Sequence, residues 1–131
     1  MAQMVKTQAY NDVELDVVLN PDNLFEIGVQ VGDTGIVANA EGKKIIPAGT
    51  PVGNSSASPL VTRNTVVIAT NTALAGGYSY GVLRHDVDVT NGTANGTLVV
   101  RGEIDSSKCP VIVDEALAVL THLIFVNGGS Y

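Results

Sequence analysis

The chain is poor in aromatic residues, in cysteine and in basic residues. It has no tryptophan, two phenylalanines and four tyrosines among 131 residues. A hydrophobic core must therefore be built from Val, Ile, Leu and Ala, and a core rich in Val favours β-structure. The same scarcity argues against a sugar-binding surface, because such a surface usually stacks the sugar on an exposed Trp or Tyr.

A single cysteine, Cys109, excludes an internal disulfide and with it the class of disulfide-stapled miniproteins. The basic residue nearest to it in the sequence is Lys108, and no nucleophile motif surrounds it, so we interpret Cys109 as a small apolar residue. The two histidines, His85 and His122, are too few to build a zinc site with one thiol. We expect neither a metal nor a cofactor.

Basic residues number seven against thirteen acidic ones, which gives a net charge of −6. Sequence-independent binding to nucleic acid needs clustered Lys and Arg, so nucleic acid is excluded as a partner. Seven acids and no base lie between Lys6 and Lys43, which indicates a solvated acidic surface; the alternative is a surface that meets a basic patch on a partner. No run of eighteen apolar residues and no signal-peptide pattern occur, so we expect a soluble, cytoplasmic product with no membrane partner.

Short alternating runs separated by turn residues fill most of the chain, which is typical of a β-rich protein. Strands are expected at residues 13–17, 24–31, 35–38, 44–46, 64–70 and 123–126, and one helix within 110–122. Residues 47–53 hold two prolines and two glycines, so we expect them outside any central strand. The predicted fold is all-β (β-dominated α+β): a small β-barrel or sandwich with one short C-terminal helix, in a single domain of residues 13–131 after a flexible arm of residues 1–12.

Residues 81–104 are predicted to form a β-hairpin. Alternation places Asp86, Asp88 and Thr90 on one face of its first strand and His85, Val87 and Val89 on the other. The sequences Asn91-Gly92 and Asn95-Gly96 supply the turn. Cross-strand pairing of the polar face with Arg84 or Arg101 is the structural interpretation of these acids.

The acids of this strand also resemble the start of a calcium-binding loop. The sixth position, Asn91, is not Gly and the twelfth, Thr97, is not Glu, which argues against that site. A nucleophile elbow, a phosphate loop and a dinucleotide fingerprint are absent from the sequence. We therefore expect no enzymatic activity.

Two segments carry a family resemblance: IPAGTPVG at residues 46–53 and GVLRHDVDVTNGTANGTLVVRGEIDSSKCP at residues 81–110. Taken in order and at this spacing, the chain resembles the head decoration and head fibre proteins of tailed bacteriophages over about residues 44–126. The resemblance implies a non-enzymatic virion protein, synthesised in the host cytoplasm. It would bind the major capsid protein on the outer surface of an icosahedral head, as a homotrimer, and stabilise or decorate that head.

The residues expected to contact the capsid or a neighbouring subunit fall into two groups. The N-terminal arm adds a strand to a neighbour through main-chain hydrogen bonds, and the hairpin presents charged side chains. These residues are Val5, Tyr10, Val13, Leu15 and Val17 in the first group and Arg84, His85, Asp86, Asp88 and Arg101 in the second. Two alternatives stay open: another virion part, such as a head completion or tail protein, and a carbohydrate-binding β module displayed on a surface.

Overall fold

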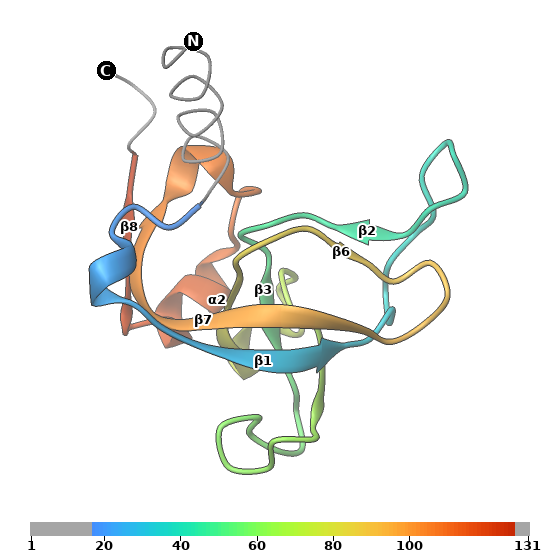
Figure 1. Cartoon of the computed structure of the whole chain (residues 1–131), viewed down its shortest axis with the longest axis horizontal. Helices are drawn as coiled ribbons and strands as arrows, with labels where there is room; N and C mark the ends of the chain where they lie inside the picture. The colour runs from blue at the N-terminus through green and yellow to red at the C-terminus, as the bar shows by residue number, and fades with distance from the viewer. Residues whose placement is uncertain (1–16, 128–131) are drawn as a thin grey trace, which may run out of the picture.

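The computed structural model describes residues 17–127. Five strands close a β-barrel, so the predicted fold class, a β-dominated small barrel with one short helix, is confirmed (Figure 1). Around the barrel the strands follow the order β1, β4, β3, β5 and β7, and β7 pairs with β1 to close it. Their bounds are β1 Phe25–Val31, β3 Pro51–Gly53, β4 Val66–Ala69, β5 Ser79–Leu83 and β7 Ala94–Asp105.

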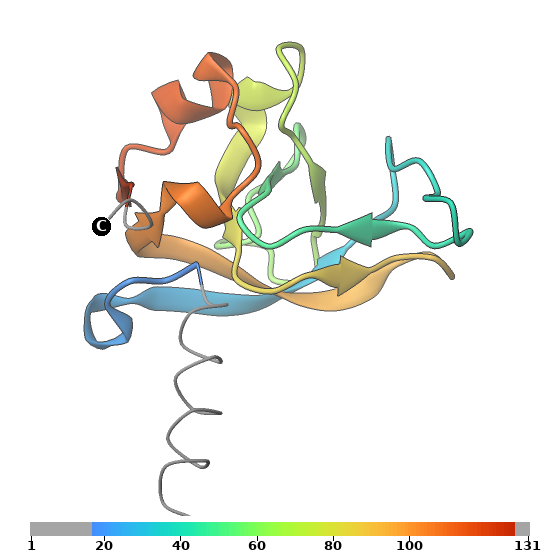
Figure 2. The same ribbon diagram turned by 90° about the horizontal axis from the view of Figure 1, so that it is seen from above.

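Smaller elements stand at the two ends of the barrel. They are η1 (Pro21–Asn23), β2 (Ile45–Ile46), η2 (Gly76–Tyr78), β6 (Val87–Asp88), η3 (Ser106–Lys108), α2 (Asp114–Val119) and β8 (Leu123–Val126). Seen from above, β1 and β7 run side by side, with the β2–β6 pair at one end and α2 toward the other (Figure 2). The expected arm of residues 1–12, together with Val13 and Leu15, lies outside the described residues.

Strand β7 is long enough to belong to two sheets. Its first part pairs antiparallel with β1 and β5 inside the barrel. Its last four residues pair in parallel with β8, from Gly102 opposite Leu123 to Asp105 opposite Val126. On the other side of β7, Val18 forms an antiparallel bridge with Ile104. We call this second unit, made of Val18–Leu19, residues 102–105 and β8, the end sheet.

Each of these units has its own hydrophobic cluster, and β5 and β7 contribute to both. Val82 and Val99 pack beneath the end sheet and α2, while their chain neighbours Leu83 and Leu98 point into the barrel. The barrel cluster consists of Val29, Val31, Ile46, Val52, Val67, Leu83, Val87, Val89, Leu98 and Val100. The second cluster consists of Val17, Val18, Val82, Val99, Ile104, Ala116, Leu120 and Leu123. The core is thus aliphatic, as the composition predicts.

Several local predictions are confirmed. The strands predicted at 24–31, 44–46, 64–70 and 123–126 correspond to β1, β2, β4 and β8. The C-terminal helix exists but is short: Val113 is still extended, and the helix ends before Leu120, whose ψ of 52° is not helical. The helix therefore lies within residues 110–122, as predicted, and covers six of them.

Two other predictions are wrong. Residues 35–38 form no strand, because the backbone N–H of Ile36 donates to the carbonyl of Asp33 in a turn that passes through Gly35 at φ +78°.

Strand β3 lies inside the barrel between β4 and β5, although it starts at Pro51. A proline is tolerated there because it is the first residue of the strand. Gly53 is also required, since a Cβ at this position would meet the carbonyl oxygen of Tyr78.

The predicted hairpin is correct in its pairing, but its first strand is interrupted. The two arms do pair, with Val82 opposite Val99 and Leu83 opposite Leu98. After Arg84, whose backbone N–H still donates to the carbonyl of Thr97, the chain bends away from β7, and residues 87–88 become β6, which pairs with β2. The alternation read as one strand therefore spans two strands in different sheets.

Of the two Asn-Gly pairs, only the first forms a turn. Gly92 has a φ of +106°, which favours glycine. Gly96 lies within β7 opposite Val29. A Cβ on Gly96 would come within 2.9 Å of Val31 and 3.1 Å of Val87. This glycine makes room for core side chains where a turn was expected.

Gly81 gives a test of how closely β5 and β7 approach. A Cβ there would meet the carbonyl oxygen of Val99 and would lie 2.8 Å from Leu98 Cδ1, whereas a Cβ on Gly28 meets nothing within 4 Å. We predict that Gly81→Ala lowers the free energy of unfolding by about 2 kcal/mol or more. Gly28→Ala should change it by less than about 0.5 kcal/mol. Urea unfolding followed by circular dichroism measures both, and equal midpoints for the two variants would contradict the assigned packing.

Candidate functional site

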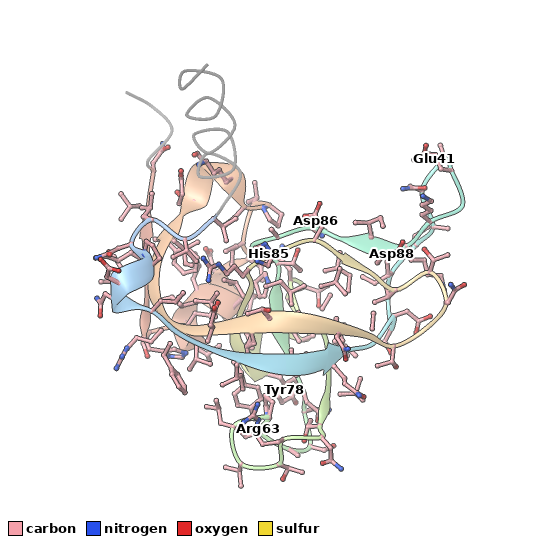
Figure 3. All side chains as sticks on the ribbon, viewed as in Figure 1. Glu41, Arg63, Tyr78, His85, Asp86 and Asp88 are labelled. Carbon is pink, nitrogen blue, oxygen red and sulfur yellow. The ribbon has the colours of Figure 1, made fainter. Side chains whose placement is uncertain are left out.

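A shallow pocket of about 520 Å³ brings together four of the predicted contact residues. Its lining is Val17, Pro47, Ala48, Arg84, His85, Asp86 and Lys108. We call it the His85 pocket. Figure 3 shows His85 and Asp86 at the bend that links β5 to β6. The pocket is therefore built from four parts of the chain that are distant in sequence.

The bend exists because Ala48 and Gly49, just before β3, form hydrogen bonds with the chain where it leaves β5. The backbone N–H of Gly49 donates to the carbonyl of Leu83 at 2.7 Å. The backbone N–H of Ala48 donates to Oδ1 of Asp86, also at 2.7 Å. These bonds hold residues 84–86 at the surface, so His85 is exposed although alternation placed it on the face of Val87 and Val89.

Arg84 has a different partner from the one expected. Its Nη1 donates to both carboxylate oxygens of Glu26, at 2.8 and 3.0 Å, and the two side chains are only 20% and 32% exposed. Of the acids expected to pair with it, Asp86 accepts from the backbone N–H of Ala48 and Asp88 from Thr90. The ion pair fixes the arginine at the pocket wall and ties it to β1.

Lys108 reaches the pocket from η3. Its Nζ lies 3.7 Å from Oδ2 of Asp105, whose side chain is 3% exposed. The other oxygen of Asp105 accepts bonds from the backbone N–H and the hydroxyl of Ser107, at 3.0 and 2.6 Å. The buried carboxylate therefore anchors η3 and holds the lysine near His85. The pocket combines a charged rim, which includes the acid Asp86 as well as Arg84 and Lys108, with an apolar floor formed by Val17, Pro47 and Ala48.

The remaining predicted hairpin residues lie elsewhere. Asp88 is exposed on β6, and its Oδ1 accepts bonds from the hydroxyl and the backbone N–H of Thr90. Both bonds lower the pKa of the Asp88 carboxyl, and the bond from the Thr90 hydroxyl has the larger effect. Arg101 is exposed on β7 opposite Phe25. Neither residue lines the His85 pocket.

Of the N-terminal group, only Val17 is described. It is 1% exposed and packs in the second hydrophobic cluster, so its side chain belongs to the core. The predicted contacts of Val5, Tyr10, Val13 and Leu15 lie outside the described residues. Val17, where the described chain begins, also lines the His85 pocket.

Sequence reasoning missed Glu26 and Lys108 as parts of this site. Glu26 was one of seven acids assigned to a solvated surface, and its partner Arg84 is 58 residues away. Local alternation contains no signal for such a distant pair. Lys108 did stand within residues 81–110, the second segment of the family resemblance, which was the available signal.

A second groove, of about 370 Å³, bears on the carbohydrate alternative. It is lined by Gly28, Val29, Gln30, Arg63, Asn64, Asn95 and Gly96. Its amides offer hydrogen bonds, and Arg63 donates to the carbonyl of Gly28 at 3.3 Å. The lining includes no aromatic ring on which a sugar could stack.

Across residues 17–127 no group of three or more His, Cys, Asp or Glu side chains is arranged to hold a metal ion. In the same range, no helix has both the length and the apolar character needed to span a membrane. Comparisons with protein-family models, with curated proteins and with solved structures found no match. The resemblance to phage head proteins thus stays a prediction from the sequence.

Cys109, close to the pocket, yields a prediction about pH. The thiol donates to the carbonyl of Asp105 at 3.4 Å and packs against Gly49, where the φ of +86° and the absence of a Cβ make room for it. Burial, and then the negative charge of Asp105, raise the pKa of Cys109 from 9.0 to about 11. The folded protein therefore keeps this thiol protonated between pH 9 and 11, and the thiol's contribution to stability is lost as the pH rises through that range.

We predict that iodoacetamide labels Cys109 at pH 8 about a hundredfold more slowly in the folded protein than in urea, because the thiolate is the reactive form. Mass spectrometry of timed samples measures the two rates. Equal rates in the folded and unfolded protein would contradict the raised pKa.

Proposed function

We propose that this chain is a non-enzymatic structural protein of a phage virion. In this proposal it binds the major capsid protein on the outer surface of an icosahedral head, as a homotrimer, and stabilises or decorates that head. One observation carries the proposal. The two sequence segments that resemble head decoration proteins meet in space at the His85 pocket, since Pro47 and Ala48 come from the first and residues 84–86 and Lys108 from the second.

The chemistry of the pocket supports a protein partner. Arg84 is held by Glu26 and Lys108 by Asp105, so the basic groups are positioned before any partner arrives. An apolar floor with a charged rim matches the usual anatomy of protein interfaces. A carboxylate side chain on the capsid surface, entering between His85 and Lys108, fits this rim.

The place where the described chain begins is the second support. Val17, the first described residue, lines the pocket, and Val13 and Leu15 precede it in the sequence. In this proposal the arm expected from the sequence and the pocket act on the same capsid surface.

Co-sedimentation with expanded heads that lack their decoration protein tests the function. We expect saturable binding at a multiple of the number of three-fold positions. His85→Glu should weaken binding at least tenfold, because it places an acid where a capsid carboxylate is proposed to enter. His122→Glu is the matched control: His122 is exposed too and does not line the pocket, so its affinity should stay within about twofold of the parent.

Two further outcomes decide between the parts of the proposal. Undiminished head binding by a chain lacking residues 1–12 would exclude the arm as a capsid contact. A folded, monodisperse protein that ignores the heads would overturn the capsid function and favour a tail component or a surface-binding module, which a glycan array then separates.

A further inference from the structure

The turn between β6 and β7 contains an asparagine followed by a glycine, Asn91-Gly92. Figure 1 shows this turn at the edge of the molecule, beyond the β2–β6 pair. Asn91 is exposed, and Gly92 has a φ of +106°. A Cβ built on Gly92 would meet nothing within 4 Å, so neither side chains nor backbone of other residues enclose this glycine.

An asparagine before a glycine is chemically reactive. The side-chain Cγ of the asparagine and the backbone nitrogen of the next residue can close a five-membered ring. Glycine has no side chain to obstruct that approach, and its backbone reaches conformations that other residues avoid. The reaction is slowed where the side chain of the asparagine or the backbone of the glycine is held in place.

Most of the other described asparagines lack a free side chain or a following glycine. Four of them use side-chain atoms in hydrogen bonds with the backbone: Asn20, Asn39, Asn54 and Asn71. Asn23 and Asn64 are followed by a leucine and a threonine, whose side chains obstruct the attack. Between residues 17 and 126, Asn91 and Asn95 combine a following glycine with a side chain that makes no hydrogen bond.

Asn95 is held by the sheet. It lies in β7 opposite Gln30, and Gly96 lies opposite Val29, so both residues belong to the ladder that closes the barrel. Val29 is part of the barrel cluster. An attack by the nitrogen of Gly96 therefore needs the opening of the barrel itself.

Asn91 is restrained far less. The backbone N–H of Gly92 donates to the carbonyl of Val89 at 3.0 Å, a single bond across the turn. Exposed turns open locally at a much lower free energy than the strands of a core. The nitrogen of Gly92 is therefore released for attack without unfolding of the barrel.

We propose that Asn91 is a site of spontaneous modification, which deamidates through a cyclic succinimide formed with Gly92. The backbone nitrogen of Gly92 loses its proton to hydroxide and attacks Cγ of Asn91. A C–N bond forms, and the side-chain nitrogen takes up a proton from water and leaves as ammonia. A second water opens the ring at either carbonyl and leaves an aspartyl or an isoaspartyl residue at position 91. The inference does not depend on the proposed function.

The modification changes both the charge and the backbone of the turn. Either product adds a negative charge to the turn that follows Asp88, and the isoaspartyl form also lengthens the main chain by one atom. The turn is joined to β2 by two bonds: the backbone N–H of Lys44 donates to Oγ1 of Thr90 at 2.9 Å, and that of Val89 donates to the carbonyl of Lys44 at 2.8 Å. We expect the isoaspartyl product to loosen the β2–β6 pair and to leave the barrel folded.

Incubation of the folded chain at pH 8, with peptide mapping by mass spectrometry of timed samples, tests the inference. Asn91 and Asn95 are both followed by Gly-Thr, so the local sequence gives them similar intrinsic rates. In the folded protein we expect Asn91 to deamidate at least tenfold faster than Asn95, and in urea we expect similar rates at the two sites. Mapping also resolves Asn127, whose following glycine lies outside the described residues, so its conversion is counted separately.

The products and a variant test the route. Ring opening gives isoaspartyl as well as aspartyl product, whereas direct hydrolysis of the side-chain amide gives aspartyl product alone. An isoaspartyl-specific methyltransferase assay on the isolated peptide distinguishes the two routes. Asn91→Gln is the control variant: its side chain is one carbon longer and does not close the five-membered ring, so this peptide should keep its mass while the same peptide of the parent changes. Circular dichroism checks that the variant is folded.

Three results would overturn the inference. Equal rates at Asn91 and Asn95 in the folded protein would show that the turn gives no selectivity. An Asn91 that stays unmodified in the folded protein while the same residue is converted in urea would show that the turn protects it. Aspartyl product without isoaspartyl product would exclude the succinimide.

Discussion

The structure depends on one strand, β7, which is shared between two hydrophobic clusters. Its first part closes the barrel against β1, and its last four residues carry β8 and the bridge to Val18. Gly102 lies at the junction with a φ of +155°, a conformation that favours glycine. Because Leu98 points into the barrel and Val99 into the second cluster, neither unit can move without disturbing the packing of the other.

The candidate site follows from this arrangement. The second cluster fills the space between β5, β7 and α2, and Val17 at its margin forms part of the floor of the His85 pocket. Glu26, on the strand that closes the barrel, holds Arg84 at the pocket wall. The proposed capsid contact at this pocket is thus built on both units of the fold.

The sequence predicted what depends on near neighbours and missed what depends on distant ones. Strands such as β1 and β8 follow from local alternation, and an aliphatic core follows from the composition. Alternation does not identify the strand with which a given strand pairs, so the residues of β5 and β6 were predicted to form one continuous strand. An Asn-Gly pair signals a turn, yet Gly96 is needed for packing, a requirement that appears only when Val31 and Val87 are in place. Likewise, only part of the candidate site was predicted. His85 and Asp86 belong to the alternating segment of residues 81–104, whereas Glu26 meets Arg84 only in the folded chain.

Native-state hydrogen exchange tests the shared strand most directly. The amides of Leu19 and Asp105, bonded across the end sheet, and those of Gly32 and Leu83, bonded within the barrel, report on the two units. If β7 couples them, all four exchange with the same opening free energy, equal to that of global unfolding. Exchange of Leu19 and Asp105 at an opening energy several kcal/mol lower, with the barrel amides still protected, would show that the end sheet opens on its own and would contradict the account.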